Sequence, residues 1–109
     1  MTVKEAAHRL GFDILAGEQG LDAPISSVYC CDLLSFAMGR APESSAWVTV
    51  MGNVNAVAVA SLTDVSCIVL AESAQADDQA LQKANTEGIP ILSSKNSVFE
   101  TAKAIDQNL

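Results

Sequence analysis

The second half of the chain alternates between short apolar runs and segments with helical spacing. Apolar runs at 46–50, 67–70 and 89–92 predict strands, and each is followed by a segment with the features of a helix. The segment at 54–62 suits either a buried strand or a buried helix, and its alanines favour the helix. Repeated strand–helix order is typical of parallel strands joined by right-handed crossovers. The sequence therefore predicts an α/β fold with a mainly parallel sheet flanked by helices.

Capping residues mark where the outer helices begin. Thr2 with Glu5, and Ser97 with Glu100, have the spacing of a capping box, and Gly11 is placed to end the first helix. The last helix is expected to turn Val98, Ala102, Ile105 and Leu109 inward. Both ends of the chain are thus predicted to be helical.

The remaining elements are shorter. Residues 12–16 and 28–30 are strand candidates. Asp32 is expected to cap a short helix that Gly39 ends, and Asp77 begins a helix that Gly88 ends. Pro90 predicts that its strand lies at a sheet edge or that the proline stands at the strand start. No linker divides the chain, so residues 1–109 are expected to form one domain.

Charge and cysteine usage exclude several classes of protein. The net charge is −7, and the six basic residues are scattered rather than clustered, which argues against binding to nucleic acid or to an anionic membrane surface. No apolar run reaches the ~20 residues of a membrane-spanning helix. The N-terminus has the pattern of a capped helix rather than a signal peptide, and the three cysteines make no disulfide framework. We therefore expect a cytoplasmic protein.

The residue types that carry catalysis lack partners in the sequence. His8 is the single histidine, and Cys30, Cys31 and Cys67 do not have the spacing of a redox pair or a zinc site. Cys67 lies in an apolar run and is expected to pack as a small hydrophobic residue. The sequence contains no glycine-rich phosphate loop. We expect no catalytic residue, no metal site and no cofactor.

One junction between a strand and a helix is a candidate ligand site. Gly52 follows the strand at 46–50, and Asn53 can cap the next helix, with Asn55 one residue further on. A helix N-terminus after a parallel strand presents free N–H groups, which suit a small anionic or nucleotide-like ligand. Gly52 is expected either to have a positive φ or to lie against the ligand. The competing interpretation is that Asn53 only caps the helix.

Several short segments, in this order and spacing, resemble a known family. They are Leu15-Ala16-Gly17, Gly20-Leu21-Asp22, Asp32-Leu33-Leu34-Ser35, Trp47-Val48-Thr49-Val50 and Gly88-Ile89-Pro90-Ile91-Leu92-Ser93. Over almost its whole length the chain resembles the DRTGG-domain family, which includes the N-terminal domain of HPr kinase/phosphorylase and the middle domain of some phosphate acetyltransferases. Where that family reads Gly-Asp-Arg-Thr-Gly-Gly, residues 52–57 here read Gly-Asn-Val-Asn-Ala-Val. The resemblance therefore does not transfer a charged role for this motif.

The resemblance implies a fold like the N-terminal domain of HPr kinase and a non-catalytic regulatory role. A free-standing copy would sense a small ligand, bind a separately encoded enzyme, or do both. The resemblance also adds Asp32 and Ser35, from a segment shared with the family, to the candidate ligand residues. The alternative is a purely structural subunit that dimerises or scaffolds.

A homodimer is also expected from an apolar segment. It comprises Tyr29, Leu33, Leu34, Phe36 and Met38, and either this segment or Trp47 is predicted to lie near the contact.

Overall fold

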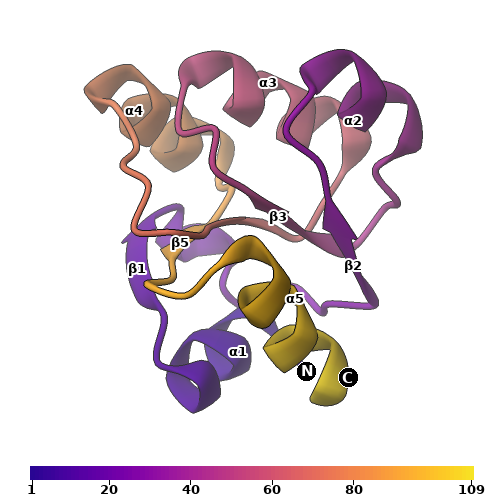
Figure 1. The fold of residues 1–109 in the computed structure, drawn as a ribbon. Coiled ribbons are helices and arrows are strands. Elements are labelled where there is room, and N and C mark those ends of the chain that lie inside the picture. Colours follow the sequence, from indigo (N-terminus) through magenta and orange to yellow (C-terminus); the bar gives the residue numbers. More distant parts are fainter.

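A single five-stranded sheet with helices on both faces forms the molecule (Figure 1). This computed structural model describes residues 1–109. The helices are α1 (Val3–Leu10), α2 (Leu34–Arg40), α3 (Val54–Thr63), α4 (Asp78–Glu87) and α5 (Val98–Gln107), with a short 3-10 helix, η1 (Glu18–Gly20). The strands are β1 (Asp13–Ala16), β2 (Ser27–Cys30), β3 (Ser45–Thr49), β4 (Cys67–Leu70) and β5 (Ile91–Ser93). The predicted α/β class is confirmed.

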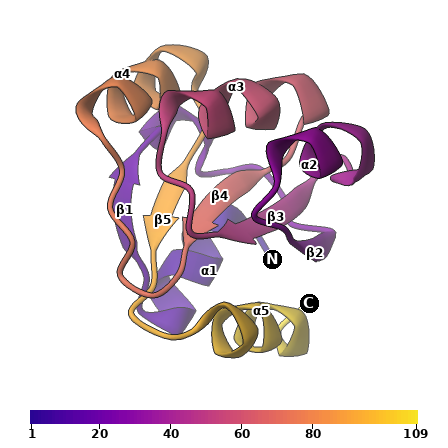
Figure 2. The ribbon, with the colours of Figure 1, turned by 45° about the horizontal axis from the view of Figure 1, so that its top comes forward.

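The sheet has the strand order β1-β5-β4-β3-β2 (Figure 2). Strands β2 to β5 run parallel, and β1 pairs antiparallel with β5 at one edge. Pro90 precedes β5, so the proline stands at the strand start, and β5 itself lies inside the sheet. Because four neighbouring strands are parallel, their carboxyl ends meet along one side of the sheet, which we call the carboxyl edge.

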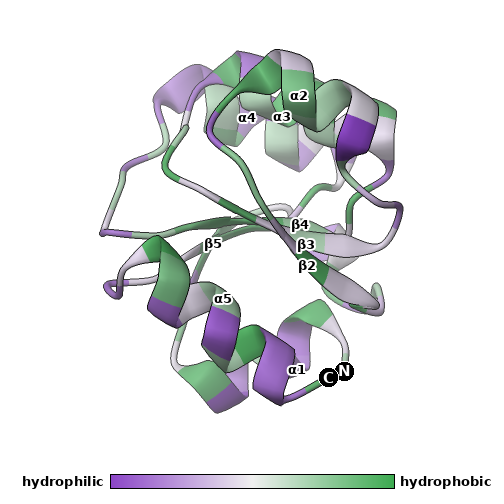
Figure 3. Cartoon of the chain, turned by 45° about the vertical axis from the view of Figure 1, so that its right-hand side comes forward, coloured by the Kyte–Doolittle hydropathy of each residue, from purple (hydrophilic) through white to green (hydrophobic).

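The central strands divide the core into two layers. In β3, Trp47 packs toward α2, α3 and α4, whereas Ala46 and Val48 pack toward α1 and α5. This period of two is what a strand imposes on its side chains. Both faces are covered, so β3 and β4 are buried along their whole length. Along α1 and α5, hydrophilic and hydrophobic bands alternate, as expected for helices with one face on the sheet (Figure 3).

Trp47 is fully buried, and its Nε1–H donates to the carbonyl of Cys31 at 3.0 Å. The prediction that Trp47 could lie near a dimer contact is therefore wrong. An indole between two strands and three helices is a core residue whose one polar atom has a partner.

Most helix ends follow the sequence, but α5 and α2 differ from it. Thr2 and Glu5 form the complete capping box of α1, but at α5 only the Ser97 half is present, where Oγ accepts the N–H of Glu100 at 3.1 Å. Helix α2 continues through Gly39 and ends at Arg40, with Ala41 as its C-cap, because Pro42 restricts the residue before it to an extended backbone.

Along α5, Val98 and Ala102 are partly buried and Ile105 is fully buried. Leu109 lies beyond the helix and is exposed, contrary to the prediction. The buried polar position is Thr101, whose hydroxyl pairs with that of Ser94 at 2.8 Å. This pair fixes α5 to the chain just after β5.

Candidate ligand site at the carboxyl edge of the sheet

Asn53 is the N-cap of α3. Its Oδ1 accepts the N–H of Ala56 at 2.9 Å, which satisfies one of the N–H groups that a helix start leaves without an intrahelical partner. Asn55, in the first turn of the same helix, has an exposed side chain. The capping interpretation of Asn53 is confirmed, and the amide of Asn55 faces solvent at the same helix end.

Gly52 is required by close packing within the chain. It does not have a positive φ, so that expectation is wrong. A Cβ at this position would overlap the carbonyl oxygen of Gln75, and the carbonyl of Gly52 accepts the N–H of Asp77 at 2.9 Å. The β3–α3 and β4–α4 loops therefore touch backbone to backbone, and the residue against Gly52 belongs to the protein itself.

Asp32 links two strands instead of capping α2. Its Oδ1 accepts the hydroxyl of Thr49 at 2.7 Å and the N–H of Val50 at 3.0 Å. The N-cap of α2 is Leu33, which makes no side-chain cap. The predicted cap is wrong because the end of β3 offers this carboxylate two donors at once.

The structure brings four of the five predicted ligand residues to neighbouring junctions. Gly52, Asn53 and Asn55 lie at the β3–α3 junction, and Asp32 bonds to the residues just before it. Ser35 is exposed in the first turn of α2, which packs against α3. These residues therefore belong to one region, although Ser35 lies at its margin.

A cavity that the sequence did not indicate lies further along the same edge. Its volume is about 370 Å³. The lining combines apolar and uncharged polar side chains from β1, the β4–α4 loop, α4 and β5, namely Leu15, Ser73, Ala74, Gln75, Ala76, Leu81 and Ser93. Glu72 and Ser73, at its rim, both have left-handed backbones, with φ of 60° and 55°. Neither residue is glycine or asparagine, so the residue types did not predict this loop conformation.

Comparison with known proteins establishes the family. The sequence matches the DRTGG domain over residues 5–108. The chain belongs to the DRTGG-domain family. Among the curated proteins, no sequence matches this DRTGG domain.

One similar solved structure shares the fold of this DRTGG domain. It contains the CBS and DRTGG domains of the regulatory region of Clostridium perfringens pyrophosphatase, complexed with the activator diadenosine tetraphosphate. The TM-score is 0.77 at 12% sequence identity, and the match covers 99% of this chain and 47% of that one. This chain thus spans about half the length of the structure that it matches, and the similarity demonstrates a shared fold.

The carboxyl edge of this DRTGG domain is rich in carboxylates. Asp32, Glu72, Asp77 and Asp78 are exposed along it, and Lys95, after β5, is the basic residue in its loops. Because residues 52–57 also carry no charge, binding here would depend on hydrogen bonds and apolar contacts. Such binding is less sensitive to salt than binding through ion pairs.

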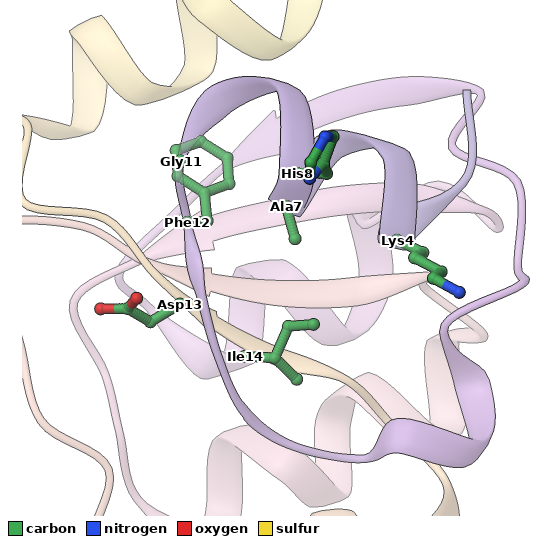
Figure 4. Close-up of a pocket in the computed structure, with 7 residues that line it drawn as sticks. All are labelled: Lys4, Ala7, His8, Gly11, Phe12, Asp13 and Ile14. Atoms are coloured by element: carbon green, nitrogen blue, oxygen red, sulfur yellow. The ribbon is translucent and has the colours of Figure 1, made fainter.

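The single histidine lies away from this edge. His8 is exposed on α1 and lines a cavity of about 430 Å³ beside β1, together with Lys4, Ala7, Gly11, Phe12, Asp13 and Ile14. Figure 4 shows the carboxylate of Asp13 directed away from His8 and Lys4. Catalysis by His8 would require a nucleophile or a carboxylate within hydrogen-bond reach, and the side chains that line this cavity do not provide one.

Cys67 is fully buried in β4, which confirms its packing role. Burial raises the pKa of its thiol to about 12, so the thiol stays protonated at neutral pH.

No group of three or more His, Cys, Asp or Glu side chains is placed to hold a metal ion. None of the helices combines the length and the apolar character that crossing a membrane demands.

Proposed function

We propose that this DRTGG domain is a non-catalytic regulatory module that senses a small, nucleotide-like ligand. The observation that carries the proposal is the match of nearly the whole chain to the regulatory region of an enzyme whose activator is a dinucleotide. The arrangement of the carboxyl edge supports it, because open parallel sheets bind ligands outside the carboxyl ends of their strands.

The proposed contacts are Gly52, Asn53 and Asn55, with Asp32 and Ser35 beside them. Apart from that of Ala56, which Asn53 caps, the N–H groups in the first turn of α3 lack intrahelical partners, and the amide of Asn55 can donate or accept. No cation assists them within residues 52–57, so the expected affinity is modest.

A ligand screen tests this proposal directly. The full chain would be tested by thermal shift against AMP, ATP and diadenosine tetraphosphate, and any nucleotide that raises Tm would be titrated by calorimetry. Asn55→Ala should weaken binding about tenfold, the effect of losing one hydrogen bond. Asn53→Ser keeps the cap and reports on a separate ligand contact. Full affinity in both variants would place the site elsewhere, and no shift with any nucleotide would contradict ligand sensing.

The second candidate function is a structural subunit that dimerises or scaffolds. It is favoured by the apolar surface near α2, where Leu33, Phe36 and Met38 are 52%, 45% and 53% exposed. Leu33 and Phe36, three positions apart, lie on the same side of α2, and neighbouring exposed apolar side chains are typical of contact surfaces. The same surface would serve a homodimer or a separately encoded enzyme, and the oligomeric state decides between them.

A further inference from the structure

We infer that the cavity lined by Leu15, Gln75 and Ser93 holds a neutral planar heterocycle, such as the base of a nucleoside. This inference deepens the proposed function and rests on it, because it assigns the base of the nucleotide-like ligand to a place of its own. The cavity was not among the sites that the sequence indicated.

The position of the cavity fits ligand binding. Ser93 is the last residue of β5, and the loop that carries Ser73 and Gln75 follows β4, the strand beside it. Two neighbouring parallel strands therefore end at the cavity, where open α/β sheets bind ligands. The volume of about 370 Å³ lies within the roughly 300–1,000 Å³ range of small-molecule sites.

The lining selects the chemistry of the ligand. Leu15 and Leu81 supply apolar surface for the faces of a ring, while Ser73, Gln75 and Ser93 supply hydroxyl and amide groups for its polar edge. No lining side chain carries a charge. The carboxylates nearby, on Glu72, Asp77 and Asp78, would repel a phosphate. A neutral heterocycle satisfies all of these conditions, whereas an anion does not.

The polar rim is held in place before a ligand arrives. The N–H of Glu72 donates to the carbonyl of Asn96 at 2.7 Å, and that of Ser73 donates to the carbonyl of Ser94 at 2.9 Å. These bonds hold two consecutive non-glycine residues in the left-handed region, a conformation that costs free energy and is concentrated at functional sites. The backbone of Gln75 also packs against Gly52, so the cavity adjoins the α3 N-terminus.

Two adjacent residues of β1 provide a matched pair of variants. Leu15 lines this cavity and Ile14 lines the cavity beside α1, yet both side chains are 40% exposed. Leu15→Glu and Ile14→Glu therefore add the same charge to the same edge strand at similar cost to folding, but only the first places it in the proposed site.

The experiment is a calorimetric titration of the full chain with the neutral nucleosides adenosine, guanosine, cytidine and uridine. We expect at least one nucleoside to bind with an affinity that does not depend on salt. Leu15→Glu should weaken that affinity more than tenfold, and Ile14→Glu should leave it unchanged. Gln75→Ala should weaken it about tenfold, as the loss of one hydrogen bond.

The inference is overturned if no nucleoside binds, or if the two glutamate variants weaken binding equally. Nucleotides that bind normally to Leu15→Glu but poorly to Asn55→Ala would also overturn it while leaving the proposed function intact. If neither nucleosides nor nucleotides bind, both the inference and the proposed function are contradicted.

Discussion

Gly52 has a structural requirement that a family motif alone would not explain. Its missing side chain lets the β3–α3 loop meet the carbonyl of Gln75, and its own carbonyl holds the N–H of Asp77. A glycine retained from the Gly-Asp-Arg-Thr-Gly-Gly pattern therefore maintains the contact between two loops at the carboxyl edge, even though the charged part of the pattern is absent.

Gly52→Ala should lower the free energy of unfolding by about 1–3 kcal/mol, because the new methyl group forces backbone against backbone. Gly39→Ala is the matched control. It lies within α2 with no atom near the added carbon, so alanine should raise stability by about 0.5–1 kcal/mol. Urea unfolding of both variants measures the two signs, and a neutral Gly52→Ala would contradict the packing argument.

Ser45 is a buried polar residue without a partner for its side chain. The hydroxyl of this first residue of β3 makes no hydrogen bond, although the side chain is fully buried. Ser45→Ala should raise the free energy of unfolding by about 1 kcal/mol, because the unfolded state no longer gains by hydrating that hydroxyl. Thermal and urea unfolding check this, and a destabilised variant would show that the hydroxyl has a partner.

The buried thiol of Cys67 is expected to make the stability of the protein depend on pH in the alkaline range. The thiol titrates near 9 in an unfolded chain, whereas burial raises its pKa in the folded protein to about 12. Between these values the unfolded state loses a proton that the folded state keeps, so stability falls as the pH rises above 9. The slope approaches about 1.4 kcal/mol per pH unit.

Urea unfolding from about pH 8 to about pH 10.5 measures that slope. Cys67→Ala removes the titrating thiol, so its stability should decline less steeply than that of the wild type. Equal slopes would assign the alkaline loss of stability to other groups.

At the scale of elements, α3 depends on its N-cap for stability. Asn53→Ala should lower the free energy of unfolding by about 1 kcal/mol, because the N–H of Ala56 loses its side-chain acceptor. Asn53→Ser keeps an acceptor and should remain within a few tenths of a kcal/mol of the wild type. Urea unfolding of the pair isolates the cap, and equal losses in both would argue against it.

Local signals predicted the elements well, and long-range contacts were what the sequence could not supply. The caps at Thr2, Asn53 and Asp77, and the left-handed glycines at the ends of α1 and α4, depend on residues within one turn. The donors to Asp32 are Thr49, the last residue of β3, and Val50, which follows it. They are 17 and 18 positions away in the sequence, so no local pattern could predict these contacts.

The candidate site divides in the same way. The β3–α3 junction was predictable because a strand, a glycine and a capped helix follow one another in the chain. The neighbouring cavity draws Leu15 and Ser93 together from opposite ends of the sequence. Its rim also depends on a left-handed conformation at Glu72 and Ser73, which neither residue type favours. Only the assembled sheet brings these features together.

At the scale of the whole molecule, exposed aromatic residues occur on both faces. Phe36 on α2 and Phe99 on α5 are 45% and 68% exposed, and each has a cation over its ring, Arg40 at 4.0 Å and Lys103 at 5.9 Å. The surroundings differ, because Leu33, three positions before Phe36, adds exposed apolar surface on the same side of α2. The α2 face is therefore the better candidate for a contact between copies.

Phe36→Asp should convert a homodimer to a monomer, because it removes an apolar ring from the contact and puts there a carboxylate whose loss of hydration a surface ion pair with Arg40 does not offset. Sedimentation velocity across a range of concentrations measures the change, and circular dichroism confirms that the variant is folded. Phe99→Asp is the matched control, since it replaces the same type of side chain, also exposed and also beneath a cation, on the opposite face. We expect it to remain dimeric. A wild-type protein that is monomeric at every concentration would remove the dimer, and loss of the dimer in Phe99→Asp alone would move the contact to α5.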